Sequence, residues 1–258
     1  IPAIVIAELL GIDSSYFDDF KAWSEAAVKT AFSPFPDPED VKLAEVAQGK
    51  LNEFFVNEIQ QRREQPGDDL LSELIRAEEA GDKLTEVELI DQCNLMLVAG
   101  NVTTTDLIGN GVKALLDNPD QMALLKNNRG LITNAVEEML RFDSPVVGSA
   151  RIPNKDTDIQ GCPIVKGATL SVSLAAANHD PAVYPDPSRF DIERVDTHHQ
   201  SFGGGRHMCL GAHLARVEAQ EAILALIARF PELRYSDKGF VRAVVPGFRG
   251  YESLWVCG

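Results

Sequence analysis

Apolar residues recur at three- and four-residue intervals along the first 148 positions of the chain, a spacing typical of amphipathic helices. The longest expected helix runs from Thr85 to Asn118, and it starts at a capping box in which Thr85 and Glu88 satisfy each other's backbone donors. Its middle carries Gly100 and a run of threonines, residue types that weaken a helix. We therefore expect a local disturbance in the middle of this helix.

An alternation with a period of two replaces the helical pattern from Ser149 onward. Short strands are expected there, with a turn at Gln160-Gly161, and they are followed by a glycine loop at 203–205 and a helix over about 210–230. The fold class is therefore mainly α with a small β part. We expect a single domain over 1–258, helical over 1–148, with the small sheet and the cysteine-bearing loop over 149–258.

Charge and cysteine content narrow the class of partner and the compartment. A net charge of −15 argues against sequence-independent nucleic-acid binding, which needs clustered Lys and Arg. Four cysteines without paired spacing do not resemble a disulfide framework, so we expect a reducing, cytoplasmic location. Apolar runs are too short to span a bilayer, so we expect no membrane contact. These features favour a small molecule or a protein as the partner.

The segment SFGGGRHMCLG, residues 201–211, carries the clearest chemistry in the chain. Its glycines allow the backbone to approach a flat ligand closely, and Cys209 precedes the last expected helix, whose N-terminal dipole favours a thiolate. A thiolate in this position suits haem iron. Two alternatives stay open from the residues alone: a structural thiol, and a zinc site with His207 and His213 that lacks a fourth ligand.

This segment resembles the haem-binding signature of the cytochrome P450 family, Phe-x-x-Gly-x-x-x-Cys-x-Gly, at Phe202, Gly205, Cys209 and Gly211. The resemblance implies the cytochrome P450 fold, with its C-terminal haem-binding portion in this chain, and a haem b cofactor whose iron is bound by Cys209. It also implies that Phe202 packs beside the thiolate and that His207 meets a haem propionate. The cofactor-binding candidates are Cys209, Arg151, His207, Phe202, Gly203, Gly205 and Gly211.

Two further segments match the family in the same order along the chain. Glu138 and Arg141 in EMLR resemble the Glu-x-x-Arg motif, which implies a buried structural network with Arg194 as the third member. Taken alone, a Glu/Arg pair at this spacing is typical of a solvated surface pair. Arg151 resembles the family arginine that pairs with a propionate, and the alternative is a charge on an edge strand.

The segment LMLVAGNVTTTDLI resembles the family's oxygen-binding segment and implies that Ala99, Gly100 and Thr103 are catalytic. In the family, one helical turn opens here so that dioxygen and water fit beside the Thr hydroxyl. Val102 is a departure, because the family normally has an acid there that helps to deliver protons. Val cannot relay a proton, and the candidates to replace the acid are Asn101 and Asp106.

Together the matches imply a haem-thiolate monooxygenase that inserts one oxygen atom of O₂ into a small apolar substrate, using electrons from a ferredoxin or flavodoxin partner. Val102 keeps two alternatives open: a non-catalytic haem or small-molecule binding protein, and a peroxide-driven P450. By the same resemblance the chain lacks an N-terminal portion. The expected docking patch for the electron donor is Arg206, His207, His213 and Arg216, and the candidate pocket walls, equally expected in a core, are Val98, Ala99, Val102, Val146 and Val147.

Overall fold

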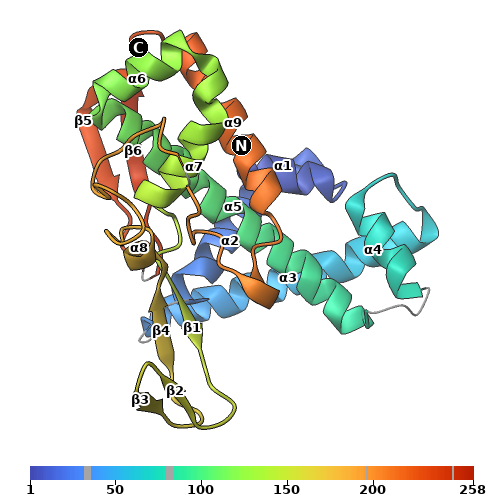
Figure 1. Cartoon of the computed structure of the whole chain (residues 1–258). Coiled ribbons are helices and arrows are strands. Elements are labelled where there is room, and N and C mark those ends of the chain that lie inside the picture. Colours follow the sequence, from blue (N-terminus) through green and yellow to red (C-terminus); the bar gives the residue numbers. More distant parts are fainter. Residues whose placement is uncertain (32–35, 80–83, 196, 246) are drawn as a thin grey trace. The chain divides into compact units, whose positions relative to one another are not determined.

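The structure is a computed structural model, and it describes residues 1–31, 36–79, 84–195, 197–245 and 247–258. These residues group into two compact units, Ile1–Thr105 and Asp106–Gly258. Helix α5 (Glu86–Asp117) contributes residues to both units. The elements are labelled along the chain in Figure 1. The expected single domain stays a prediction.

Helices dominate the first unit. Asp37 caps one of them, because its Oδ1 accepts the backbone N–H of Glu39 at 2.8 Å, and Pro38 occupies the first helical position. Residues 65–69 separate this helix from the next one. In chain order the elements are α1 (Pro2–Leu9), a 3-10 turn (Ser14–Tyr16), α2 (Phe17–Ala31), α3 (Pro38–Glu64), α4 (Leu70–Glu79) and the first part of α5.

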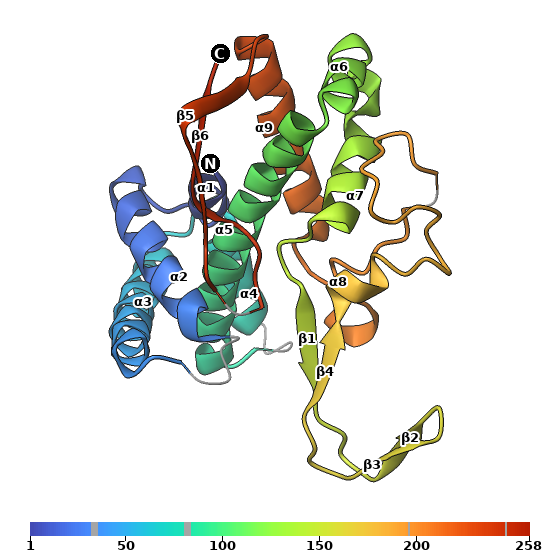
Figure 2. The same cartoon turned by 90° about the vertical axis from the view of Figure 1, so that its left-hand side faces the viewer.

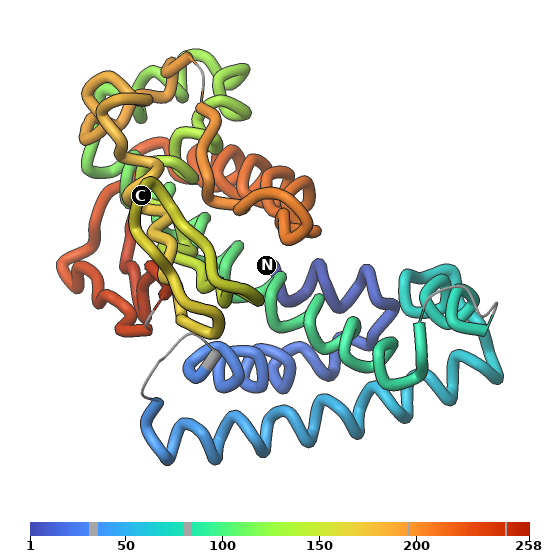
Figure 3. Tube along the Cα trace, turned by 60° about the horizontal axis from the view of Figure 1, so that its bottom comes forward, coloured from blue at the N-terminus to red at the C-terminus, as the bar shows by residue number. Residues whose placement is uncertain are grey.

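An aromatic cluster between α2 and α3, which lie side by side in Figures 1 and 3, forms the core of the first unit. The rings of Phe20 and Phe54 are 5.0 Å apart and nearly perpendicular, at 89°. Phe55 stacks on Phe20 at 6.4 Å, and both side chains are fully buried. Aromatic pairs of this geometry contribute roughly 0.5–1.5 kcal/mol beyond the area they bury. The cluster therefore fixes α2 against α3.

Helix α5 begins as the sequence predicts. The backbone N–H of Thr85 donates to Oε2 of Glu88 at 2.8 Å, and the N–H of Glu88 donates to Oγ1 of Thr85 at 3.3 Å. The expected disturbance in the middle of α5 is wrong, because the helix is continuous from Glu86 to Asp117. The Thr103 hydroxyl donates to the Ala99 carbonyl at 2.8 Å, so the threonine supplements the helical bonding rather than breaking it.

The second unit has its core between α5, α7 and α9. Gly111 of α5 permits close packing, because a Cβ there would lie 2.6 Å from Sδ of Met139 on α7. Val136 of α7 and Ile223 of α9 are fully buried in the same cluster. The elements are α6 (Pro119–Asn127), a 3-10 turn (Arg129–Leu131), α7 (Ile132–Phe142), β1 (Gly148–Arg151), β2 (Thr157–Ile159), β3 (Cys162–Ile164), β4 (Leu170–Ser173), α8 (Leu174–Ala177), a 3-10 turn (Gly205–His207), α9 (Ala212–Arg229), β5 (Arg234–Arg242) and β6 (Tyr251–Cys257).

The strands of the second unit form antiparallel pairs, β1 with β4, β2 with β3 and β5 with β6. In the first pair Gly148 lies opposite Ser173, and Figure 2 shows this ribbon leading to β2 and β3. The turn between β2 and β3 uses positive φ angles at Gln160 (53°) and Gly161 (85°), as expected for a two-residue hairpin. The mainly α fold with a small β part is confirmed. Among the described residues, no helix is both long and apolar enough to cross a membrane.

Candidate functional site

The loop that carries Cys209 is closed by its own backbone. The N–H of Cys209 donates to the carbonyl of Phe202 at 2.9 Å, and the N–H of Gly203 donates to the carbonyl of Gln200 at 2.8 Å. Helix α9 begins at Ala212, three residues after Cys209. The Cys209 side chain is exposed, so its sulfur is free to reach a ligand. The interpretation as a buried structural thiol is therefore wrong.

The glycines of this loop leave space around it and permit its backbone conformation. Gly203 and Gly205 have φ angles of 64° and 66°, a region in which other residues are strained. A Cβ added at Gly204, Gly205 or Gly211 would meet nothing within 4 Å. The loop thus presents open space beside the Cys209 residue rather than a packed surface.

The donor set of this loop fits haem better than zinc. Within the described ranges, no group of three or more His, Cys, Asp and Glu side chains is placed to hold a metal ion. A structural zinc site needs four protein ligands, whereas haem iron needs one protein thiolate because the porphyrin itself supplies four nitrogen ligands. The zinc interpretation with His207 and His213 is therefore not supported. The assignment of Cys209 as the ligand of haem iron stays a prediction.

Glu138, Arg141 and Arg194 form a charge cluster in the same unit as this loop. Nε and Nη2 of Arg141 donate to the two carboxylate oxygens of Glu138 at 2.7 and 2.8 Å, and both side chains are fully buried. Nε of Arg194 donates to the same carboxylate at 3.2 Å. The surface-pair interpretation is therefore wrong for Glu138 and Arg141. A buried charge set with this many hydrogen bonds is costly to break at one member.

The remaining donors of Arg141 bind backbone carbonyls of the long connection between α8 and the cysteine loop. Its Nη1 donates to the carbonyls of Asn178 and Pro187, each at 2.9 Å. The Asn178 amide donates to Oγ of Ser201 at 2.9 Å, and Ser201 in turn donates to the carbonyl of Leu140 at 2.6 Å. Asn178 and Ser201 are residues that the sequence analysis missed. The network therefore extends to the residue that precedes Phe202.

A second acid on α7, Glu137, was also missed by the sequence analysis. Arg216 of α9 donates to both of its carboxylate oxygens, at 2.6 and 2.9 Å, and Nε2 of His199 lies 3.1 Å from Oε2. Burial opposes ionisation of this carboxyl, but the hydrogen bonds from His199 and Arg216 outweigh burial and lower the pKa of Glu137 to about 2. The adjacent acids in the sequence VEEMLR were the available signal.

The two residues expected at the haem propionates lie on exposed parts of the second unit. Arg151 ends β1, and its Nη1 donates to Oγ of Ser149 at 2.6 Å and to the Ala150 carbonyl at 2.7 Å. His207 lies in the 3-10 turn that precedes Cys209 and is exposed. Both side chains are accessible to an anionic group. Their roles toward haem stay predictions.

The expected oxygen-binding residues lie in the part of α5 that belongs to the first unit. Ala99 is exposed, and Gly100, Val102 and Thr103 are partly buried. A Cβ at Gly100 would lie 2.8 Å from Cγ1 of Ile6 on α1, so this glycine also serves close helix packing. Val98 and Val102, two of the candidate pocket walls, are partly buried, as are Val146 and Val147 in the second unit. Their side chains are thus neither fully in a core nor fully in solvent.

The two candidates to replace the missing acid differ in chemistry, because Asp106 has a carboxyl group and Asn101 has an amide. The side-chain amide of Asn101 donates to Oγ of Ser24 at 2.7 Å and is buried. Asp106 lies against Gly250, and burial, reinforced by the charge of Asp143, raises its pKa to about 7. The Asp106 carboxyl therefore holds a proton at pH values where exposed acids are ionised.

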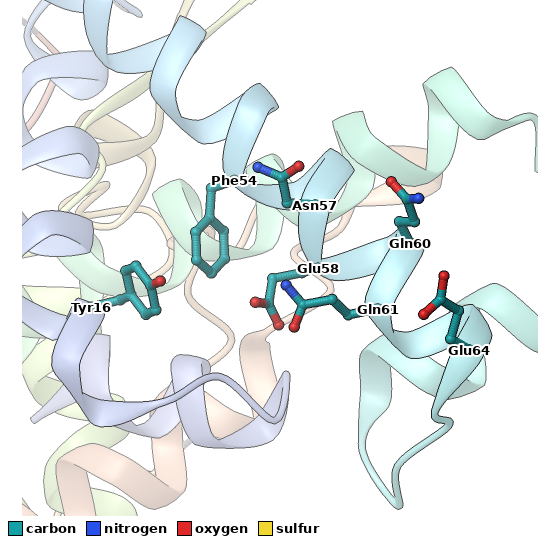
Figure 4. A pocket seen from close by; sticks show the side chains of 7 residues that line it. All are labelled: Tyr16, Phe54, Asn57, Glu58, Gln60, Gln61 and Glu64. Carbon is teal, nitrogen blue, oxygen red and sulfur yellow. The ribbon is translucent and has the colours of Figure 1, made fainter.

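The first unit has a pocket of about 340 Å³, lined by Tyr16 of the 3-10 turn before α2 and by residues of α3 (Figure 4). Polar and acidic side chains, Glu58 and Glu64 among them, form most of its lining, with Tyr16 and Phe54 at one end. The residues that line this pocket include neither His nor Cys. The lining of this pocket therefore offers no ligand suited to haem iron.

Comparison with known proteins identifies the family. The model of the family "Cytochrome P450" matches residues 12–238. The chain is 45% identical to cytochrome P450 107B1 of Saccharopolyspora erythraea, over 91% of the chain and 56% of that protein. It is also 45% identical to the Vitamin D(3) 25-hydroxylase of Pseudonocardia autotrophica, over 90% of the chain and 56% of that protein.

A solved structure shares the fold. It is P450BioI in complex with hexadec-9Z-enoic acid ligated Acyl Carrier Protein, with a TM-score of 0.94 and 37% identity, covering 99% of this chain and 65% of that chain. The chain thus spans a little over half the length of the curated relatives. The family model, the relatives and the shared fold agree, and the family's cofactor is haem b. The chain therefore belongs to the cytochrome P450 family.

Proposed function

We propose that this chain is the haem-binding part of a monooxygenase that inserts one oxygen atom of O₂ into a C–H bond of an apolar small molecule. The other oxygen atom leaves as water, with two electrons from a redox partner and two protons from solvent. The exposed Cys209 on a glycine loop before α9 is the observation that carries this proposal. When haem is bound, its iron supplies the dioxygen chemistry.

The cysteine loop places Cys209 just before helix α9. The N-terminal end of α9 begins three residues later, and its positive dipole end favours an anion. The backbone bond from Cys209 N–H to the Phe202 carbonyl fixes the loop in one conformation. His207 and Arg151, both exposed, are the proposed partners of the haem propionates.

Proton supply is the step at which this chain departs from its family. Thr103 carries a hydroxyl that is bonded to the Ala99 carbonyl, and Val102 has no proton to give. Asp106, whose pKa is raised to about 7 by burial and by Asp143, is the proposed proton-holding acid of α5. Its carboxyl loses and regains a proton near neutral pH, as a general acid requires.

The substrate and electron donor are proposed by class. We propose a long apolar substrate. One relative is named as a Vitamin D(3) 25-hydroxylase, and another was solved in complex with an Acyl Carrier Protein that bears hexadec-9Z-enoic acid. A ferredoxin or flavodoxin is the proposed electron donor, since complementary charge speeds the encounter of redox partners. Arg206, His207 and His213 are exposed and lie near Cys209 in the sequence, whereas Arg216 is paired with Glu137 and adds no free charge to the docking patch.

Product analysis tests this proposal. The haem-loaded protein is incubated with hexadec-9Z-enoic acid or vitamin D₃, a ferredoxin with its reductase, NADPH and heavy-isotope dioxygen. We expect a hydroxylated product that carries one heavy oxygen atom. Labelled product that forms only when peroxide replaces the electron donor would favour the peroxide-driven alternative. Bound haem with no product in either arm, across a panel of apolar substrates, would favour the non-catalytic alternative.

A substitution of Val102 tests whether proton supply limits the monooxygenase reaction. Restoring an acid with Val102→Asp places a proton donor beside Thr103 in the sequence, so coupled product formation should rise and peroxide release should fall. The ratio of product to NADPH consumed measures this coupling. Peroxide release that is unchanged in Val102→Asp would contradict a proton-supply defect at this position.

A further inference from the structure

The carboxylate of Glu137 connects α7 to both sides of the Cys209 loop. Glu137 lies beside Glu138 in the sequence, yet its partners differ, because His199 lies before the loop and Arg216 lies after it. The side chain of His199 is only 2% exposed, compared with 19% for Glu137 and 26% for Arg216. A single acid thus holds the residues on either side of the cysteine.

The arm through His199 ends on the backbone of Ser201. The Ser201 N–H donates to Nδ1 of His199 at 3.2 Å, which requires that Nδ1 carries no proton. Nε2 must then carry the proton, and it donates to Oε2 of Glu137 at 3.1 Å. The orientation of the His199 ring is therefore fixed from both nitrogens. This arm fixes the backbone one residue before Phe202.

The arm through Arg216 ends on the ring of Phe202 and on the first turn of α9. The guanidinium carbon lies 4.6 Å from the centre of the Phe202 ring, a cation–π distance, and the His199 ring lies 5.7 Å from the same ring. Nη1 of Arg216 also donates to the Ala212 carbonyl at 3.2 Å. The Phe202 carbonyl in turn accepts the N–H of Cys209 at 2.9 Å. The position of the Cys209 backbone thus depends on both arms.

We propose that Glu137, His199 and Arg216 form a positioning triad, which holds the Cys209 loop in the conformation that keeps the thiolate on the haem iron. The proposal rests on the proposed haem-thiolate function. The hydrogen bonds and ring contacts of the triad act on the loop through Ser201 and Phe202. Loss of the triad frees the loop. The Cys209 sulfur is then more readily protonated to a thiol or replaced by another ligand.

An exposed ion pair is the alternative explanation, and it predicts little effect, because such pairs contribute about 0–1 kcal/mol. Three observations argue against it. The Glu137–Arg216 contact is bidentate, the carboxylate has a second, nearly buried donor in His199, and the guanidinium is stacked on Phe202. Each fixes the geometry of the loop rather than only balancing charge.

The test compares Glu137→Gln with Glu221→Gln in the haem-loaded protein. Both variants remove one negative charge, but Glu221 is exposed on α9, outside the triad. The readout is the far red-shifted Soret band of the reduced, CO-bound protein, followed over time at an elevated temperature. Helix content is followed in parallel by circular dichroism. The reduction potential of the iron is measured at ordinary temperature.

We expect Glu137→Gln to lose the red-shifted band roughly tenfold faster than wild type, since a charge-assisted hydrogen-bond pair is removed. Helix content should fall at nearly the wild-type rate, and the reduction potential should shift. Glu221→Gln should match wild type in all three measurements. Arg216→Lys, which keeps the charge and loses the planar bidentate contact, should fall between Glu137→Gln and wild type.

Two results would overturn the triad. The first is that Glu137→Gln matches Glu221→Gln in all three measurements. The second is that Glu137→Gln loses the band and the helix content faster than wild type by the same factor, which a purely structural role predicts. If Glu137→Gln does not fold, two variants of His199 are compared by the same band measurement. His199→Gln keeps a hydrogen-bond donor toward Glu137, whereas His199→Phe has none. Equal band loss in these two would contradict the proposal. A wild-type protein without the band would instead refute the haem-thiolate function itself.

Discussion

Two neighbouring acids on α7, Glu138 and Glu137, hold two different charge clusters. Glu138 is fully buried and accepts from Arg141, Arg194 and the backbone N–H of Asp191. Glu137 is partly exposed and accepts from Arg216 and His199. The same residue type thus serves a structural network on one side of the helix and a loop-positioning contact on the other. Burial decides how much each contact contributes to stability.

The largest effect is expected when Glu138 loses its main partner. Arg141→Leu leaves a buried carboxylate with too few donors, and we expect the free energy of unfolding to fall by about 3–5 kcal/mol. Urea unfolding of the haem-loaded protein measures this. Arg189→Leu is the matched control, because the Arg189 side chain is 62% exposed and its pair with Asp191 is long, at 3.6 Å. Equal losses in the two variants would contradict the assigned role of burial.

A pH titration sharpens the contrast by adding Asp106, a partly buried acid for which no ion pair is found among the described residues. The pKa of Glu137 is lowered from 4.5 to about 2, so its contribution to stability is present above pH 4.5 and is lost as the pH falls toward 2. The pKa of Asp106 is raised from 3.8 to about 7, so its folded state keeps a proton that the unfolded state releases. Stability therefore falls as the pH rises from about 4 to 7.

Asp106→Asn isolates the loss of stability between pH 4 and 7. The variant removes a titrating group, so the free energy of unfolding should decline less between pH 4 and 7 than in wild type, by up to about 4 kcal/mol. Glu137→Gln should flatten the curve only at the acidic end. Chemical unfolding at a series of pH values gives both slopes. A wild-type decline that persists unchanged in Asp106→Asn would show that another group is responsible.

A smaller difference in the free energy of unfolding is expected when Arg194 of the Glu138 cluster is compared with Arg216 of the Glu137 cluster. Arg194→Met removes a donor whose side chain is 9% exposed, and Glu138 keeps Arg141, so we expect a loss of about 2 kcal/mol. Arg216→Met removes a donor that is 26% exposed, with an expected loss of about 1 kcal/mol. Differential urea unfolding of the two variants resolves this order. A larger loss for Arg216→Met would mean that Glu137 belongs to the folding core.

Much of the fold follows from local sequence signals. The capping residues Thr85 and Glu88, the turn at Gln160-Gly161 and the spacing of apolar residues place the elements within a few positions. The division after Thr105 was not predicted, because α5 continues through it and helical periodicity carries no information about long-range grouping. The continuity of α5 at Thr103 was also missed, because a threonine hydroxyl can either compete with helical bonds or supplement them.

The site was predictable where the motif is contiguous. Cys209, Gly205 and Phe202 follow from one segment, and Glu138 with Arg141 from another. Arg216 was expected to be a free docking cation, and its pairing with Glu137 depends on how α7 and α9 pack. His199 has no spacing signal, because its partners are 62 residues away along the chain and in the adjacent backbone. Such contacts require the tertiary structure.

The absorption spectrum of the reduced, CO-bound protein tests the central claim, that Cys209 binds haem iron as a thiolate. Cys209→Ser is compared with Cys162→Ser, since Cys162 is also exposed but lies on β3. The account predicts a far red-shifted Soret band in wild type and in Cys162→Ser, and its loss in Cys209→Ser. A red-shifted band that survives in Cys209→Ser, or is lost in Cys162→Ser, would contradict it.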